Sequence, residues 1–378
     1  MKCKLSDICS FRKGKISVDG LNRSTYISTE NMLPNKCGIT EASSLPTVQL
    51  TQEYKKGDVL VSNIRPYFKK IWKATYDGGC SNDVLVFAAN SNTDKDFLYY
   101  ILANDDFFAY SMATSKGTKM PRGDKTSIMK YEVPVMDIEL QRRIASILKS
   151  IDEKIELNNA INNNLFEQMQ ALYKAWFVDF EPFGGVRPSS WNDTNIYAIA
   201  NIIYGAPFAS KLFNTDGLGK PIIRIRDLKE QAFVTFTTEE HPKGHLIQPG
   251  DIVVGMDGEF RPYIWGNEPA WLNQRVCIFE SNRPQGKAFV LYTIKPLLNK
   301  IEQTQVATTV IHIGKKDFDA FEIILPDEAT LDSFDSITAP MIEQIVNNRL
   351  QNKRLAVLRD TLLPKLMSGE LDVSDIDL

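Results

Sequence analysis

The sequence predicts an α+β protein in which two similar modules are separated by two long antiparallel helices that form a coiled coil, with a pseudo-two-fold internal repeat. Three observations predict this fold. A heptad stripe of residues occurs twice, the segments before each stripe also match in pairs, and a Pro- and Gly-rich segment separates the first stripe from the second module. A period near 3.5 indicates paired helices, whereas β-branched runs between turns indicate a sheet.

The first stripe lies within residues 137–180. Its members recur at alternating spacings of three and four residues, with no Pro or Gly between them, which is typical of one long helix. They are Leu148, Ile151, Ile155, Asn158, Asn162, Leu165, Met169, Leu172 and Trp176.

The second stripe repeats the first at an offset of 190 residues (345 − 155). Pro340 and Pro364 lie within or beside it, and we expect each to stop or kink the second helix. The identical pairs, which we predict to be helix-pairing positions, are Ile155 and Ile345, Asn158 and Asn348, Asn162 and Asn352, Leu165 and Leu355, and Leu172 and Leu362.

The Asn residues of the stripes indicate how the helices pair. A seam Asn costs stability but fixes the register, because its amide is tolerated only opposite another polar group. Two Asn layers in each copy therefore favour pairing of the copies with each other. The alternative is two independent amphipathic helices, each packed on its own module.

The modules repeat as well. Residues 57–72 align without a gap on residues 250–265, and both segments begin with Gly-Asp and end in Ile-Trp. Gly-Asp before apolar β-favouring residues predicts a turn that leads into a strand, with Gly supplying a positive φ and Asp bonding the turn backbone. The next predicted pairs are strands at 81–89 and 273–281, helices at 97–110 and 285–303, and polar loops at 117–125 and 309–317.

Each module closes with a strand that ends in a proline, at Pro134 or Pro326, and the long helix follows at once. Pro and Gly cluster at 180–191, which predicts the break between the two halves. We expect a mostly antiparallel or mixed sheet in each module. The predicted segments are a first module at 1–135, a first helix at 136–180, a second module at 181–327, and a second helix with the C-terminal tail at 328–378.

The bulk composition is that of a globular protein with room for two cores, with 378 residues, 43% hydrophobic and 24% charged. The N-terminus has no apolar signal region and no long apolar run occurs, so we expect a cytoplasmic protein without membrane association. Five scattered Cys without CxxC spacing predict neither a disulfide framework nor a zinc ribbon. The net charge of −3 argues mildly against a nucleic-acid partner, so local basic clusters must support DNA binding.

Motifs for catalysis are missing from the sequence. It has no GxGxxG, and residues 117–125 fail the P-loop pattern because five residues separate the glycines. The amino-methyltransferase tetrapeptide is absent too. His241 and His245 have metal-ligand spacing, but Pro242 and Gly244 enforce a loop between them. We therefore predict no catalytic residue, no metal site and no cofactor bound by this chain.

Basic residues cluster at matching strand ends and loops of the two modules. Cations at such places reach DNA phosphates, and an Arg can bind guanine O6 and N7 with two hydrogen bonds. Singly, each is most simply a solvated charge, but the duplicated pattern favours a reader of a two-part DNA site. The predicted DNA-binding residues are Arg65, Lys69, Lys70, Lys73, Lys119, Arg122 and Lys125 in the first module, and Arg224, Arg226, Arg261, Arg275, Lys315 and Lys316 in the second.

The helices have the length that a spacer between two half-sites needs. A helix of about 40 residues is about 60 Å long, whereas equivalent half-sites on one face of B-DNA lie about 34 Å apart. Antiparallel helices would present two equivalent modules to the dyad-related halves of a duplex. The spacer would then set the distance between the half-sites.

These features together resemble the specificity subunit of a type I restriction-modification system over nearly the whole chain. The resemblance implies two target-recognition domains, here 1–135 and 181–327, that each read one half of an interrupted DNA site, and no catalysis by the subunit. The segments that carry it are the Gly-Asp strands at 57–61 and 250–254, the loop, strand and helix passage at 117–148, and the segments LYKAWFVDF at 172–180 and LLPKLMSGEL at 362–371.

The resemblance also implies partners. They are double-stranded DNA, two methyltransferase subunits that use S-adenosylmethionine, and, through these, ATP-dependent restriction subunits, with ATP and Mg²⁺ on the partners. Gln141, Arg142 and Arg143 on the exposed face of the first helix are candidates for docking the methyltransferase. Two alternatives are a coiled-coil protein scaffold without DNA recognition and an enzyme with its own methyltransferase or nuclease chemistry; the missing motifs disfavour the second.

Overall fold

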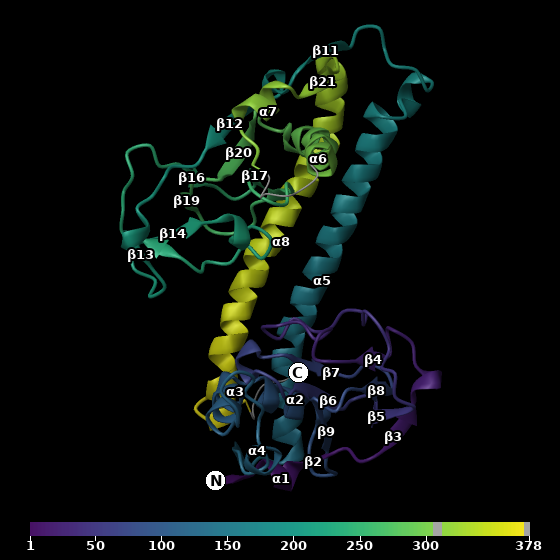
Figure 1. The fold of residues 1–378 in the computed structure, drawn as a ribbon, viewed down its shortest axis with the longest axis vertical. Coiled ribbons are helices and arrows are strands. Elements are labelled where there is room, and N and C mark those ends of the chain that lie inside the picture. The colour runs from purple at the N-terminus through teal and green to yellow at the C-terminus, as the bar shows by residue number, and fades with distance from the viewer. Residues whose placement is uncertain (305–311, 374–378) are drawn as a thin grey trace. The chain divides into compact units, whose positions relative to one another are not determined.

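The structure is a computed structural model that describes residues 1–304 and 312–373. The chain divides into two compact units, Met1–Glu153 with Leu355–Leu378 and Lys154–Arg354. Each unit contains one β-rich module and part of both long helices, α5 (Ile138–Phe177) and α8 (Glu328–Ser368), drawn in teal and yellow in Figure 1. The predicted α+β fold with two modules and two long packed helices is confirmed.

The first module is built from short strands. Its central sheet is antiparallel, in the order β2 (Cys9–Phe11), β9 (Val84–Ala89), β6 (Val59–Ser62), β7 (Ile71–Lys73). A second sheet has the order β3 (Lys15–Ser17), β5 (Leu50–Tyr54), β8 (Gly78–Cys80), β4 (Tyr26–Ile27), with β4 and β8 parallel. The end strands also pair, β1 (Lys2–Lys4) with β10 (Glu132–Pro134).

The helices of the first module differ from the prediction in one respect. The expected helix at 97–110 is two helices, because Asn104 has extended backbone and its side chain accepts the Asp106 N–H, which caps the second one. The helical segments are α1 (Leu5–Ile8), η1 (Val18–Gly20), η2 (Pro66–Phe68), α2 (Lys95–Ala103), α3 (Asp105–Ala113) and α4 (Lys125–Ile128).

The second module follows the same plan. Its central antiparallel sheet has the order β12 (Ala200–Tyr204), β20 (Val276–Ser281), β17 (Ile252–Gly255), β18 (Pro262–Ile264). Its second sheet has the order β13 (Phe213–Asn214), β15 (Phe236–Thr237), β14 (Lys220–Ile223), β19 (Ala270–Leu272), β16 (Leu246–Ile247). The other elements are β11 (Asn192–Asn195), which pairs with β21 (Glu322–Leu325), and η3 (Glu181–Phe183), η4 (Ile196–Ala198), η5 (Ser210–Leu212), η6 (Ile225–Asp227), α6 (Lys287–Thr304) and α7 (Lys315–Asp319).

The internal repeat is visible in the strand order. The sheet β12-β20-β17-β18 matches β2-β9-β6-β7 strand for strand, and the end pair β11–β21 matches β1–β10. The second sheets differ in strand number, but each contains one parallel pair, β4–β8 or β14–β19. The sequence prediction of a repeated module with a mixed sheet is therefore confirmed.

The Gly-Asp turns before β6 and β17 have the predicted geometry. Gly57 has φ +92° and Gly250 has φ +91°, a region that L side chains rarely adopt. Asp58 Oδ2 accepts the backbone N–H three residues before it at 2.8 Å, and Asp251 Oδ2 does the same at 2.7 Å. The turn chemistry thus fixes where both central strands begin.

Asn residues join the two long helices within the second unit. Asn348 Nδ2 donates to Asn162 Oδ1 at 2.9 Å, and Asn158 Nδ2 donates to Asn352 Oδ1 at 2.8 Å. Asn158 Nδ2 also lies 2.7 Å from Gln351 Oε1. The residue number on α8 decreases from 352 to 348 as the partner on α5 advances from 158 to 162, so the two helices run antiparallel.

Apolar residues of the stripes pack in each unit separately. In the second unit Leu165 and Leu172 pack against a core that includes Ile345. In the first unit Leu362 packs against a core that includes Leu148. Of the other predicted pairing residues, Ile155 and Leu355 are half-buried.

Helix α8 does not stop at its prolines, so that part of the prediction is wrong. It continues from Glu328 to Ser368 through Pro340 and Pro364. A proline removes the hydrogen bond to the carbonyl four residues earlier. Both prolines are exposed, so water can satisfy that carbonyl, while the buried face of α8 still packs on the core.

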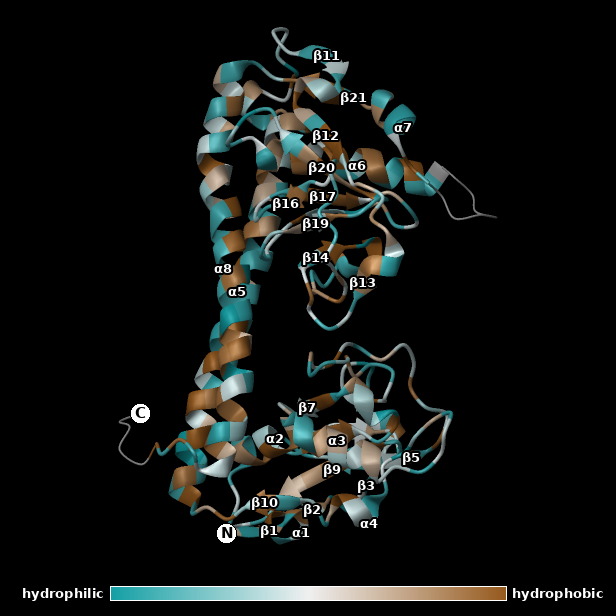
Figure 2. Ribbon diagram, turned by 90° about the vertical axis from the view of Figure 1, so that its left-hand side faces the viewer, coloured by the Kyte–Doolittle hydropathy of each residue, from teal (hydrophilic) through white to brown (hydrophobic). Residues whose placement is uncertain are grey.

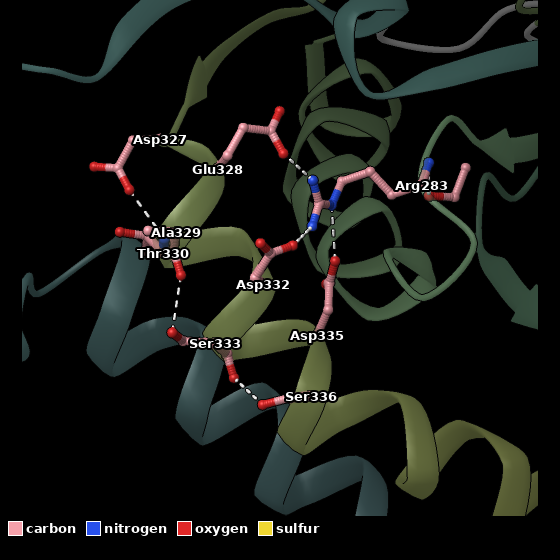
Figure 3. A network of polar contacts seen from close by, with 10 residues as sticks. Arg283, Asp327, Glu328, Ala329, Thr330, Asp332, Ser333, Asp335 and Ser336 are labelled. Carbon is pink, nitrogen blue, oxygen red and sulfur yellow. Dashed lines mark hydrogen bonds and ion pairs between the residues drawn. The ribbon is translucent and has the colours of Figure 1, made fainter.

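A polar network fixes the start of α8 to the second module (Figure 3). Arg283, in the turn before α6, bonds Glu328, Asp332 and Asp335 in the first turns of α8, with 2.9 Å between its Nε and Asp335 Oδ2. Burial raises the pKa of the Asp335 carboxyl, although the hydrogen bond from Arg283 opposes this shift. The module and the helix are therefore joined by a charged contact as well as by apolar packing.

The start of α5 is joined to the first module by Gln141, which was expected on the exposed face. Gln141 is buried, and its Oε1 accepts the Asp94 N–H at 2.9 Å. Its Nε2 donates to the carbonyls of Asn92 and Met136 at 3.2 and 2.9 Å. The Gln141 amide binds backbone groups beside the N-terminus of α2, so the expectation that Gln141 lies on the exposed face of α5 is wrong, whereas its neighbour Arg142 is exposed.

Hydrophobic and hydrophilic residues alternate along both long helices, as Figure 2 shows. Among residues 1–304 and 312–373, no helix is long and apolar enough to span a bilayer.

Candidate nucleic-acid interface

In the first module, the loop between α3 and α4 is fixed to the end of strand β6. The Arg65 N–H donates to the Pro121 carbonyl at 2.8 Å, and Ile64 and Arg122 form an antiparallel bridge. Arg65 has a left-handed backbone, with φ +50°, and its Nε is buried without a hydrogen-bond partner among the described residues. We call this contact between the late loop and the strand end the first junction.

Four predicted DNA-binding residues lie at or near the first junction: Arg65, Lys119, Arg122 and Lys125. Arg122 Nη2 lies 3.2 Å from Asp83 Oδ1, and its side chain is 55% exposed. Lys119 is exposed in the loop, and Lys125 Nζ lies 5.9 Å from the centre of the Phe11 ring. The junction therefore carries cations that water, or a phosphate, can reach.

A cavity of about 210 Å³ opens beside Lys125. Phe11, Arg12, Lys15 and Asn82 also line it. Arg12 is committed to the module, since its guanidinium binds the buried Asp58 of the Gly-Asp turn. The remaining cations, Lys15 and Lys125, give the cavity a positive rim.

An acidic residue, Asp124, ties the late loop to α4. Its carboxylate caps the helix by accepting the Ser127 N–H at 2.9 Å, and it lies 2.6 Å from Lys116 Nζ. The hydrogen bond from Lys116, followed by the one from the Ser127 backbone, lowers the pKa of Asp124 to about 2. Lys116, near the start of the loop, thus contacts both Arg122 and Asp124 near its end.

The other predicted residues of the first module are engaged by the module itself. Lys69 Nζ lies 2.8 Å from Asp105, Lys70 Nζ donates to the Thr29 carbonyl at 2.6 Å, and Lys73 pairs with Asp96. Burial lowers the pKa of both Lys70 and Lys73. A phosphate would have to displace these contacts, which makes the three lysines weaker candidates than those of the first junction.

The second module contains an equivalent second junction. The Ile313 N–H donates to the Met256 carbonyl at 2.9 Å, and Asp257 and His312 form an antiparallel bridge. With the offsets of 193 and 190, Asp257 corresponds to Ile64, and His312 to Arg122. Residues 309–311 of the predicted loop lie outside the described residues.

A carboxylate also organises the second junction. Asp257 Oδ1 lies 2.6 Å from His312 Nδ1 and 3.8 Å from Arg275 Nη1. The side chains of His312 and Arg275 are 55% and 53% exposed. Arg275 was a predicted DNA-binding residue, but His312 and Asp257 were not, although the offset of 190 places His312 opposite Arg122 and could have identified it.

The remaining predicted residues of the second module are dispersed over several elements. Arg224 and Arg226 flank or lie in η6, and Arg226 Nε is 3.6 Å from Asp227. Arg261 Nη2 is 3.6 Å from Glu302 on α6. Lys315 Nζ bonds Asp319 one turn later on α7 at 2.9 Å, and Lys316 beside it is exposed.

Both junctions carry exposed side chains that can donate hydrogen bonds to an anion. The basic side chains of the Arg122–Asp83 and Arg275–Asp257 pairs are more than half exposed, and such pairs contribute little stability. Among the described residues no group of His, Cys, Asp and Glu side chains could hold a metal ion.

Comparison with known proteins places this duplicated fold in a family. The family described as Type I restriction modification DNA specificity domain matches residues 1–167 and again residues 188–359. The HindI type I restriction enzyme specificity subunit of Haemophilus influenzae is 24% identical over 431 residues, covering 92% of this chain and 94% of that protein. The MjaIX specificity subunit of Methanocaldococcus jannaschii is 26% identical over 304 residues, covering 75% and 70%.

A solved structure has the same fold. The crystal structure of a type I restriction-modification S subunit from M. genitalium matches with a TM-score of 0.57 at 15% identity, covering 99% of this chain and 96% of that one.

The duplicated module and the paired helices thus define a DNA specificity protein. The chain belongs to the family of type I restriction-modification specificity subunits. Such a subunit is a non-catalytic member of its system, as the missing motifs led us to expect.

Proposed function

We propose that the two modules each bind one half of an interrupted DNA site through their junctions, and that the long helices set the distance between the halves. The observation that carries this proposal is the repeated junction, in which a late segment with an exposed Arg or His side chain is fixed to the end of a central strand. A DNA site with two half-sites calls for such a repeat.

The contacts at each junction suit DNA recognition. Arg122 can exchange Asp83 for a phosphate or for guanine, because its guanidinium is more than half exposed. Lys119 and Lys125 beside it would contact the backbone, which fixes position without reading sequence. In the second module Arg275 and Lys316 would supply the corresponding charge.

The long helices support the spacing role. Helix α5 has 40 residues and is continuous from Ile138 to Phe177, so it is about 60 Å long. The paired Asn layers fix its register against α8 within the second unit. A spacer of fixed register would hold a constant gap between half-sites.

The proposal includes the partners of the family. Methyltransferase subunits carrying S-adenosylmethionine would dock on the exposed helix faces, for which Arg142 is a candidate, and ATP-dependent restriction subunits with Mg²⁺ would join through them. This chain itself would hold no cofactor. It would act in the cytoplasm, where the DNA lies.

Charge reversal at the first junction tests DNA binding. The double variant Arg122→Glu and Lys125→Glu, assembled with the methyltransferase subunit, should bind duplex DNA less tightly and with a smaller dependence on salt. Each lost phosphate contact reduces the slope of log K against log salt by about one. Lys2→Glu, at an exposed residue of β1, is the control.

The result can decide between the proposal and a scaffold function. An unchanged salt slope in the double variant would remove the first junction from the DNA interface. If the assembled wild-type complex shows no DNA affinity at all, the protein scaffold becomes the better account.

A further inference from the structure

We infer that Arg122 and His312 discriminate the half-sites of their modules, and that a neighbouring carboxylate, Asp83 or Asp257, positions each of them. This inference rests on the proposed function. It adds His312 to the specificity-determining residues, and it gives the two junctions different chemistry at one equivalent position.

Backbone contacts establish that the positions are equivalent. The Asn63 N–H donates to the Asp83 carbonyl at 2.8 Å, and the Met256 N–H donates to the Arg275 carbonyl at the same distance. In each case the residue after the central strand is fixed to the turn before the neighbouring strand, β9 or β20. The bridges to the late segments follow one residue later in both modules.

The charges around this shared backbone are rearranged between the modules. In the first junction the carboxylate is on the turn, where Asp83 contacts Arg122. In the second junction that turn carries Arg275 instead, and the carboxylate has moved to Asp257, beside His312. Both modules keep a contact between the late-segment side chain and a carboxylate, although the two residues that make it differ between the modules. This argues that the carboxylate holds the late-segment side chain in place.

The geometry of His312 determines what it can read. Its Nδ1 faces Asp257 at 2.6 Å, so Nδ1–H donates to the carboxylate and Nε2 is the nitrogen that can meet a ligand. Neutral imidazole would present an acceptor there, whereas the protonated ring presents a donor. A donor suits guanine N7 or O6 and a phosphate oxygen.

Charged groups surround His312 at the second junction. Asp257 is in direct contact with its ring, Arg275 shares that carboxylate at 3.8 Å, and Lys315 and Lys316 follow on α7. Arg122 instead presents a guanidinium, which can only donate hydrogen bonds. The two junctions therefore offer a base different hydrogen-bonding groups.

Selection from a random duplex pool tests the assignment of half-sites. The probe is the pool itself, bound at pH 6.5 by the full chain assembled with the methyltransferase subunit. His312→Gln should relax base preference in one half of the wild-type motif, and Arg122→Gln should relax it in the other half. His241→Gln, which replaces another His of the second module, is the matched control.

Selection with Asp257→Asn tests the positioning role of the carboxylate. This variant should relax base preference in the same half of the motif as His312→Gln, because the imidazole loses the acceptor that holds its Nδ1. Asp257→Glu, which keeps a carboxylate, should recover part of that preference.

The outcomes separate this inference from the proposed function. A wild-type motif that survives unchanged in His312→Gln, relaxation of both halves together, or an unchanged motif in Asp257→Asn would each overturn the inference while leaving DNA recognition intact. Failure of the wild-type complex to enrich any interrupted motif would overturn both.

Discussion

At the scale of single residues, the Asn layers between the long helices are pairs whose members depend on each other. Asn162 alone changed to Leu should destabilise the fold by about 1–3 kcal/mol, because the buried Asn348 amide loses its acceptor. Changing both residues to Leu should recover that loss or exceed wild-type stability. Denaturant unfolding of the single and double variants measures the coupling.

The control for this comparison is a double variant that removes one Asn from each of the two Asn pairs. Asn158→Leu with Asn348→Leu removes one Asn from each pair, so Asn352 and Asn162 each lose a partner and the variant should stay destabilised. Equal stability of the mixed and matched double variants would contradict the pairing.

Asp124 gives a pH prediction for the first junction. Its pKa in the folded protein, about 2, is below that of an ordinary Asp, because Lys116 and the Ser127 N–H stabilise the carboxylate. The contribution to loop stability is therefore fully present above the ordinary Asp range and is lost as pH falls through about 2. A pH titration of the Asp124 carboxyl carbon by NMR should have this low midpoint. A midpoint near 4, typical of an ordinary Asp, would mean that the loop contacts are not formed in solution.

The sequence pattern indicated which residues pair between the long helices better than it indicated which residues are exposed. The stripe period identified Asn158 and Asn162 because register depends on spacing along the chain. It could not show that Gln141 is buried, since the groups it satisfies, such as the Asp94 N–H, are brought near only by the folded module. His312 became a candidate only when the bridge to Asp257 showed its equivalence to Arg122.

At the scale of elements, helix α8 contains a proline that lowers the stability of the fold. Pro340 is exposed in the interior of α8, where it removes a backbone hydrogen bond. Pro340→Ala should therefore raise the free energy of unfolding by about 1–3 kcal/mol. Thermal melting tests this, and a lower melting temperature would show that the proline supports a bend that the packing of α8 needs.

The Gly-Asp turn before β6 requires its glycine. At Gly57 the backbone has φ +92°, which strains any L side chain, whereas the Lys95 side chain near an added Cβ is flexible and can move away. Gly57→Ala should destabilise by more than about 1 kcal/mol. Gly20→Ala is the control, since Gly20 does not have a positive φ and nothing lies within 4 Å of its added Cβ. An equal effect of both changes would count against the turn argument.

The element boundaries that the sequence missed share a cause. The helix at 97–110 was interrupted because Asn104 caps a second helix, and α8 ran through its prolines because tertiary packing outweighs local propensity. Strand positions were easier to predict, since Gly-Asp turns mark the starts of β6 and β17 chemically.

At the scale of the whole molecule, the internal repeat connects sequence, fold and function. The offset near 190 predicted matching modules, the strand orders match, and the family match also falls twice, on 1–167 and 188–359. The bases that are read do not follow from the repeat, because the junction residues differ between the modules. Under the proposed function, base preference depends on junction side chains such as Arg122 and His312.

The central claim is that two modules read two half-sites at a fixed distance. The most direct test is selection and sequencing of random-sequence duplexes bound by the wild-type chain assembled with its methyltransferase subunit. The account predicts one motif with two defined halves separated by a constant number of unspecified bases. A single uninterrupted motif, halves at variable distance, or no enrichment by a complex shown to be assembled would contradict it.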